Sequence, residues 1–129
     1  MNCDNLEIIN NSISVNYASC DIFGSNSCTF ENNNFTANIF GIDALGCNGF
    51  TVQNNTFNDL LYSIELGGNN WRIIYNKFYG IQSFGVRIYG LSEENKIHHN
   101  WFFSDGNNSG PIGFDLFGTS NYFYDQETK

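Results

Sequence analysis

Glycine recurs at a fixed interval along most of this chain. Gly24, Gly46, Gly68 and Gly90 are 22 residues apart, and Gly118 follows after 28. A fixed period of this length indicates a stack of repeats in which each unit packs only on its neighbours. One such stack fits the length of the chain, so we expect residues 1–129 to form a single domain.

Each repeat contains two elements with the alternation of a β-strand and no helical period. The first element leads into the glycine and occupies residues 19–23, 41–45, 63–67, 85–89 and 113–117. The second follows the glycine, and its copies align at residues 6–13, 28–35, 50–57, 71–78 and 95–102. The unit is too short for a propeller blade and lacks the leucine spacing of a leucine-rich repeat, which leaves a parallel β-helix of about five coils.

An asparagine occupies the same place in the second element of every repeat. Equivalent residues of stacked parallel strands lie about 4.8 Å apart, so each side-chain amide can hydrogen-bond to the next one. The sequence therefore predicts an internal asparagine ladder made of Asn11, Asn33, Asn55, Asn76 and Asn100.

Alternation along the strands predicts which side chains fill the coil. Three columns of the first element are expected to point inward: Cys20, Ile42, Ile64, Val86 and Phe114; Ile22, Ala44, Leu66, Ile88 and Leu116; and Ala18, Phe40, Tyr62, Phe84 and Ile112. A fourth inward column comes from the second element, with Ile8, Phe30, Val52, Ile73 and Ile97. The small residues Ser19, Gly41, Ser63, Gly85 and Gly113 are then expected to point outward.

The same alternation places a charged column on the outside, made of Asp21, Asp43, Glu65, Arg87 and Asp115. Stacked carboxylates repel one another, and the fold has no structural need for this. Phe23, Tyr89 and Phe117 lie beside the column and offer aromatic surface to a sugar. We therefore expect this face to bind substrate through Asp21, Phe23, Tyr89, Asp115 and Phe117, with simple solvation of the sheet as the alternative.

The repeated Asn-x-Phe step, as in Asn55-Thr56-Phe57, and the Gly-Ile-Asp and Gly-Phe-Asp strands at 41–43 and 113–115 resemble a known family. They are similar to the right-handed parallel β-helix superfamily, which includes pectin-lyase-like proteins and carbohydrate-binding and sugar-hydrolase repeat domains. The resemblance covers roughly residues 5–126. It implies an all-β solenoid, with functions that range from polysaccharide lyases, hydrolases and epimerases to tailspikes and purely structural stacks.

Two kinds of chemistry fit the charged column. Carboxylates one coil apart, such as Asp43 and Glu65, approach the separation of the acid and base in retaining glycoside hydrolases, and carboxylates two coils apart approach that of inverting ones. Alternatively, Asp21, Asp43 and Glu65 would bind Ca²⁺ through oxygen ligands. Resemblance to pectate lyases would then make Arg87 the base. The strands at residues 40–43 and 112–115 also resemble the start of an epimerase motif, but Ala44-Leu45 and Leu116-Phe117 replace its Pro-His. The catalytic candidates are therefore Asp43, Glu65 and Arg87 of a polysaccharide lyase or hydrolase.

Charge and hydropathy narrow the choice of partners. Thirteen acidic against five basic residues give a net charge of −8, which disfavours nucleic acid and anionic membrane surfaces. No apolar run could span a bilayer, and the first residues lack the pattern of a signal peptide. A polysaccharide is the expected partner.

The ends of the repeat suggest a second kind of partner. The repeat is already in register by Asn5 and continues to Asn121, without capping helices. We therefore also expect self-association or continuation of the β-helix at open ends. This favours the alternative of a structural building block in a tailspike, adhesin or filament, at an extracellular or virion surface.

Cysteine and histidine give weaker signals. Cys3 and Cys47 fall two coils apart, roughly 9.6 Å by strand spacing, which is too far for a disulfide. Free cysteines are expected, which would suit the cytoplasm, and a bridge between Cys28 and Cys47 is left open. His98 and His99 are adjacent, so we expect their side chains to point to opposite sides without sharing a metal ion.

Overall fold

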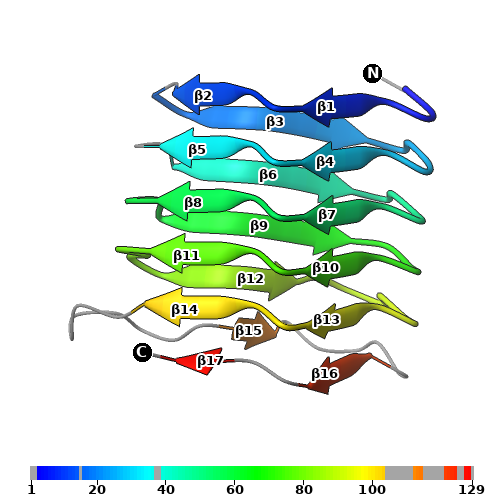
Figure 1. Ribbon diagram of the computed structural model, residues 1–129. Helices are drawn as coiled ribbons and strands as arrows, with labels where there is room; N and C mark the ends of the chain where they lie inside the picture. The colour runs from blue at the N-terminus through cyan, green and yellow to red at the C-terminus, as the bar shows by residue number, and fades with distance from the viewer. Residues whose placement is uncertain are drawn as a thin grey trace.

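The computed structural model describes residues 3–14, 16–36, 39–103, 112–114, 121–124 and 127–128, with the backbone alone for 112–114, 123 and 127–128. Every regular element in these residues is a β-strand. The strands form three parallel sheets that run the length of the stack, with sheets A and B side by side and sheet C behind them (Figure 1). This is the all-β solenoid that the repeat predicts.

The three sheets take their strands from successive repeats. Sheet A contains β1 (Glu7–Ile9), β4 (Thr29–Glu31), β7 (Thr51–Gln53), β10 (Arg72–Ile74), β13 (Lys96–His98) and β16 (Tyr122–Tyr124). Sheet B contains β2 (Ser12–Ser14), β5 (Asn34–Thr36), β8 (Thr56–Asn58), β11 (Lys77–Tyr79), β14 (Trp101–Phe103) and β17 (Glu127–Thr128). Sheet C contains β3 (Ala18–Phe23), β6 (Phe40–Leu45), β9 (Tyr62–Gly67), β12 (Phe84–Ile88) and β15 (Ile112–Phe114).

The register reproduces the sequence repeat. Glu7 pairs with Thr29, Thr29 with Thr51 and Thr51 with Arg72, at steps of 22, 22 and 21 residues. Four regular turns, β1–β3 to β10–β12, therefore follow the period of about 22. A longer step of 24 residues then links Arg72 to Lys96 and begins a less regular turn, followed by β16 and β17.

The corner between sheets A and B contains the asparagine column. Oδ1 of Asn55 accepts a 2.9 Å hydrogen bond from the backbone N–H of Asn33, and Oδ1 of Asn76 accepts one of the same length from Asn55. The bonds continue through all five positions, namely Asn11, Asn33, Asn55, Asn76 and Asn100. They satisfy backbone groups that the bend leaves without a sheet partner, which is what a buried corner requires.

Aromatic rings fill much of the space inside sheet B. Phe35, Phe57, Phe78 and Phe102 form a stack with centroid separations of 4.9, 5.0 and 4.6 Å. Each fully buried ring contributes about 1.5–3 kcal/mol through burial, and stacking adds about 0.5–1.5 kcal/mol for each pair. The predicted inward column of sheet A is confirmed, since Phe30, Val52, Ile73 and Ile97 are all fully buried.

One predicted inward column of sheet C is wrong. Gly41 and Ser63 are buried, whereas Phe40 and Tyr62 are only half-buried. A Cβ on Gly41 would lie 3.1 Å from the ring of Phe57, so this position faces the core. The alternation breaks here because two consecutive residues, such as Ser63 and Ile64, both face inward.

The same reversal applies along the sheet. The paired registers of β3, β6, β9 and β12 skip the small residue of each strand, as expected where a strand bends. The column of small side chains, which includes Gly41 and Ser63, faces the crowded interior of the coil. The aromatic residues Phe40, Tyr62 and Phe84 therefore belong to the outer face.

All four cysteines are free thiols. Cys28 and Cys47 are fully buried in the core, and Cys20 packs against it. Burial raises the pKa of the Cys20 thiol to about 11 and also raises the pKa values of Cys28 and Cys47. In these positions the thiols act as small apolar fillers of the core.

Candidate functional site on the outer face of sheet C

The predicted charged column forms on the outer face of sheet C. Parallel pairing places Asp21 beside Asp43, Asp43 beside Glu65, and Glu65 beside Arg87. The side chains come from β3, β6, β9 and β12, one from each successive turn. Strand geometry alone therefore brings three of the predicted carboxylates and Arg87 into one line.

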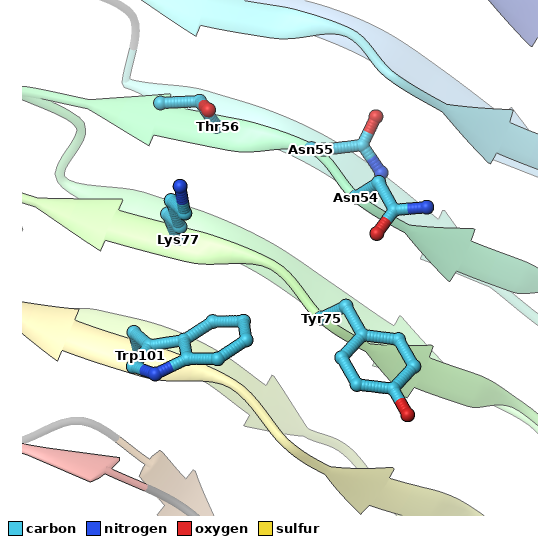
Figure 2. Close-up of a pocket in the computed structure, with 6 residues that line it drawn as sticks. All are labelled: Asn54, Asn55, Thr56, Tyr75, Lys77 and Trp101. Atoms are coloured by element: carbon cyan, nitrogen blue, oxygen red, sulfur yellow. The ribbon is translucent and has the colours of Figure 1, made fainter.

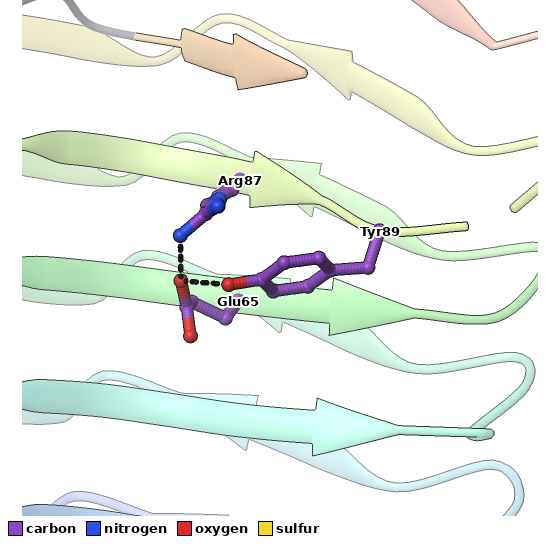
Figure 3. Close-up of polar contacts among 3 residues, drawn as sticks. All are labelled: Glu65, Arg87 and Tyr89. Carbon is purple, nitrogen blue, oxygen red and sulfur yellow. Dashed lines mark hydrogen bonds and ion pairs between the residues drawn. The ribbon is translucent and has the colours of Figure 1, made fainter. Parts of the chain in front are cut away.

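Glu65 is the most enclosed member of this column. It is 4% exposed, and its Oε1 accepts hydrogen bonds from Tyr89 Oη at 2.8 Å and Arg87 Nη1 at 3.3 Å (Figure 3). Arg87 also lies 4.5 Å from the centroid of the Tyr89 ring. The three side chains therefore hold one another in place, and a buried carboxylate obtains two donors.

Asp43 lies one turn before Glu65 and is half-buried. Burial raises the pKa of its carboxyl group, and the neighbouring charges of Glu65 and Asp21 raise it further. The added effect of the neighbours comes from the stacking that the sequence predicts, since like charges one strand apart disfavour ionisation. The environment of Asp43 therefore favours the protonated form of its carboxyl group.

An outer aromatic row of Phe40, Tyr62 and Phe84 runs beside the charged column. The ring centroids are 5.3 Å apart between Phe40 and Tyr62, and 6.2 Å apart between Tyr62 and Phe84. The guanidinium carbon of Arg87 lies 5.7 Å from the ring centroids of both Tyr62 and Phe84, which places these rings on the charged face.

Strict alternation assigns these rings to the core, so it does not predict the outer aromatic row as a site. The sequence does contain a signal, because every repeat has a small residue at the next position, as in Phe40-Gly41 and Tyr62-Ser63. A column of small side chains fits a crowded interior better than a free surface.

The predicted substrate-binding aromatics differ in their surroundings. Phe23 is 47% exposed and leaves its ring open to solvent. Tyr89 is half-buried, and its hydroxyl and ring face Glu65 and Arg87. It therefore serves first to orient the carboxylate. Asp115 and Phe117 lie outside the described residues, as do Leu116 and the side chains of Ile112 and Phe114.

The predicted register of the last strand is wrong by two residues. Arg87 pairs with Gly113, the place that the sequence analysis gives to Asp115, and Ile88 pairs with Phe114. A shift of two keeps the alternation intact, so periodicity cannot detect it. The longer connection between β14 and β15 changes the repeat length and removes the spacing that fixed the other turns.

The three carboxylates expected as Ca²⁺ ligands come from successive turns of sheet C. Within the described residues no group of three or more His, Cys, Asp or Glu side chains is arranged to hold a metal ion. The expected Ca²⁺ ligands Asp21, Asp43 and Glu65 are stacked in one line rather than around a centre, and Glu65 Oε1 is turned to Arg87 and Tyr89.

The prediction for the two histidines is also wrong. Nδ1 of His98 and Nδ1 of His99 are 2.7 Å apart, so the rings lie on the same side of the chain. His99 has a φ of 54°, which takes it out of the strand conformation and cancels the alternation. The sequence contained no direct indication of this turn beyond the position of His99 immediately before Asn100.

Comparison with known families agrees with this architecture. A family model described as a right-handed beta helix region matches residues 1–125. The chain belongs to this family. Searches of curated proteins and of solved structures return no match. The match shows that this β-helix is right-handed, as the resemblance implied, and it assigns no substrate.

A separate observation concerns membranes. In the described part of this β-helix, no helix is long and apolar enough to cross a bilayer.

Proposed function

We propose that the outer face of sheet C contacts a carbohydrate chain lying along the stack. The observation that carries the proposal is the parallel course of the outer aromatic row and the charged column, with Arg87 in contact with the rings of both Tyr62 and Phe84. A polymer along this direction meets an aromatic ring and an ionisable side chain at each of the three turns that contain β6, β9 and β12.

The chemistry of the face suits sugars. Carboxylate oxygens of Asp21 and Asp43 accept hydrogen bonds from hydroxyl groups, and aromatic side chains supply apolar contact to the C–H groups of a sugar ring. The rings of Phe40 and Tyr62 are nearly parallel, at 17°, and follow one another along the stack. Phe23, with its open ring, offers a stacking platform at one end.

A hydrolytic reaction is the second candidate, because the environment of Asp43 differs from that of Glu65. The carboxyl group of Asp43, with its raised pKa, suits a general acid, and the Glu65 side chain is held in place beside it by Arg87 and Tyr89. Neighbours in a parallel sheet are about 4.8 Å apart, close to the roughly 5–5.5 Å separation of retaining glycosidases. Arg87 would position Glu65 and stabilise charge.

A structural role is the alternative to carbohydrate contact. In the part of the chain that the structure describes, no strand pairs with the outer edges of β1, β2 and β3. Free edges of this kind pair with further strands when these are present. Self-association or continuation of the solenoid through these edges is therefore the corresponding proposal, and it is compatible with a glycan-contacting face.

Binding to an array of neutral and acidic glycans tests the main proposal. Tyr62→Ala and Asp43→Asn should each reduce binding to the best glycan by about tenfold or more, since each removes a contact of the face. Thr51→Ala, on the outer side of sheet A, is the matched control and should leave binding unchanged. Equal binding by all three variants with intact folds would contradict the proposal. Light scattering of the same samples tests self-association.

Release of reducing ends from the bound glycan tests the hydrolytic candidate. Asp43→Asn and Glu65→Gln should each abolish turnover. If the unmodified chain binds the glycan without any turnover, the hydrolytic candidate fails and the face only binds.

A further inference from the structure

A separate pocket lies on sheet B, at its corner with sheet A. It has a volume of about 270 Å³ and is lined by Asn54, Asn55, Thr56, Tyr75, Lys77 and Trp101 (Figure 2). Small-molecule sites span roughly 300–1,000 Å³, so a pocket of this size holds about one small ring with its substituents. It belongs to a different sheet from the charged column.

The pocket is built by three successive turns. Lys77 of β11 pairs with Thr56 of β8 on one side and with Trp101 of β14 on the other. Asn54 and Tyr75 have φ values of 55° and 57°, and this left-handed backbone directs both side chains outward at the corner. The lining is therefore fixed by the sheet register and by the corner.

Two aromatic rings form one side of the pocket. The centroids of Tyr75 and Trp101 are 6.4 Å apart with an interplanar angle of 31°, and Tyr75 is 43% exposed (Figure 2). The Asn55 amide is already used by the ladder, donating to Asn76 Oδ1, Phe30 O and Gln53 O. Asn55 therefore lines the pocket with its amide donors already in use, whereas the side chains of Asn54 and Thr56 can hydrogen-bond to a ligand.

Lys77 is the charged residue of this lining. It is exposed and forms no ion pair with any other described residue, in contrast to Arg87, which is bound to Glu65. Arg72 and Lys96 are exposed neighbours of each other on the adjoining sheet A. Three of the five basic residues of a chain with net charge −8 are therefore found on sheets A and B, and Lys77 is the one that lines the pocket.

We propose that this pocket binds the carboxylate-bearing ring of an acidic sugar, a uronate residue of a glycan. The Lys77 ammonium pairs with the carboxylate, Tyr75 and Trp101 contact the C–H groups of the ring, and Asn54 with Thr56 hydrogen-bond to its hydroxyl groups. The inference rests on the proposed function only in taking a glycan as ligand, and it adds a second site with its own chemical preference.

Tryptophan fluorescence provides a readout specific to this pocket. Trp101 is half-buried at the pocket, whereas Trp71 is fully buried in the core, and the chain has two tryptophans. A trigalacturonate and its methyl ester are matched probes, since the ester replaces the charge of each carboxylate by a methyl group and leaves the sugar rings unchanged. The acid should change the emission of Trp101 saturably, and the ester should bind at least about tenfold more weakly because the charge-assisted bond is absent.

Variants assign the effect to Lys77. Lys77→Met keeps the aliphatic stem and should weaken binding of the acid by about tenfold or more without changing affinity for the ester. Lys96→Met, which removes an equal charge outside the pocket, should change affinity by less than about twofold. Trp101→Phe should remove the fluorescence response while thermal unfolding shows that the fold is intact.

The outcomes separate this site from the one on sheet C. Absence of a response to the acid, equal affinity for acid and ester, or equal losses in Lys77→Met and Lys96→Met would overturn the proposal. Tyr62→Ala should leave the Trp101 response unchanged. If the Trp101 response persists while the sheet C variants show no loss on the glycan array, the sheet B site stands and the proposed function fails.

Discussion

The hydroxyl group of Tyr89 donates a 2.8 Å hydrogen bond to Oε1 of Glu65, which lies one turn away in the stack. Arg87 Nη1 reaches the same oxygen at 3.3 Å, and its guanidinium group covers the Tyr89 ring. Because Glu65 is almost fully buried, these donors compensate the cost of removing a carboxylate from water. The orientation of Glu65 therefore depends on two side chains of the following turn.

This dependence predicts coupled losses of stability. Tyr89→Phe should lower the free energy of unfolding by about 1 kcal/mol and Arg87→Met by about 2–3 kcal/mol, since each leaves Glu65 with fewer donors. In the background of Glu65→Gln both losses should shrink, which urea unfolding measures as a double-mutant cycle. Tyr17→Phe, at an exposed ring, is the control and should change stability by less than about 0.5 kcal/mol. Strict additivity of the three substitutions would contradict the linkage.

The environment of Asp43 predicts a pH dependence. Its pKa in the folded state is raised by burial and by Glu65 and Asp21, so the folded state binds this proton more tightly than the unfolded chain does. The resulting stabilisation is fully present below the ordinary pKa of 3.8 and is lost as the pH rises through the raised folded-state value.

Asp43→Asn removes this titration. The melting temperature of the variant minus that of the unmodified chain should therefore increase as the pH rises from about 3.5 to about 7. Thr51→Ala on sheet A, which removes no ionisable group, should give a difference that stays flat with pH. A difference for Asp43→Asn that falls as the pH rises would mean that Asp43 is stabilised as the anion.

The repeat makes most of this fold predictable. One 22-residue period specifies which residues become neighbours, so Asp21, Asp43, Glu65 and Arg87 can be placed in one column without knowledge of the coordinates. The same logic places the ladder asparagines at one corner. Because successive repeats stack on one another, residues spaced by one repeat along the sequence become neighbours on adjacent strands. This step needs no information about side-chain packing.

The predictions that are wrong concern residues at which the chain departs from the ideal alternation of a β-strand. The bend at Ser63 turns two successive residues inward and moves Tyr62 outside, and the left-handed conformation of His99 brings two adjacent rings together. Each is a change in the backbone conformation at a single residue, and a pattern of strict alternation cannot predict such a change. The sheet B pocket was missed for a related reason: Lys77 and Trp101 look like ordinary exposed strand positions until the corner residue Tyr75 is placed.

The asparagine ladder should show a gradient of stability along the stack. Asn55→Ala removes donors to Phe30 O, Gln53 O and Asn76 Oδ1, and it leaves buried polar groups without partners. At about 1–3 kcal/mol for a buried unsatisfied group, we expect a loss of about 3 kcal/mol or more. Asn11→Ala, at the exposed end of the same ladder, should cost about 1 kcal/mol or less. Equal losses in urea unfolding would mean that burial does not determine the contribution of the ladder.

Thiol reactivity should follow burial. Cys28 and Cys47 are fully buried and Cys20 has a pKa of about 11, so few thiolates are available to react at neutral pH. An aromatic disulfide reagent at pH 8 should modify these three thiols slowly in the native state and rapidly in guanidinium chloride. Cys3→Ser serves as the control, because it removes a thiol that is not fully buried. Rapid native modification of all four thiols would show that the core opens readily.

The repeated glycines should differ in their tolerance of alanine. Gly68 and Gly90 occupy the same place in successive repeats and have φ values of 151° and 62°. A Cβ on Gly68 would overlap the carbonyl oxygen of Cys47, whereas a Cβ on Gly90 would meet nothing within 4 Å. Gly90→Ala should therefore cost only the backbone strain, about 1–2 kcal/mol. Gly68→Ala adds a steric clash with backbone that cannot move without disturbing the preceding turn, so its melting temperature should fall well below that of Gly90→Ala. Similar melting temperatures for the two variants would show that the corner at Gly68 can relax. The φ value alone would then explain why these positions of the repeat require glycine.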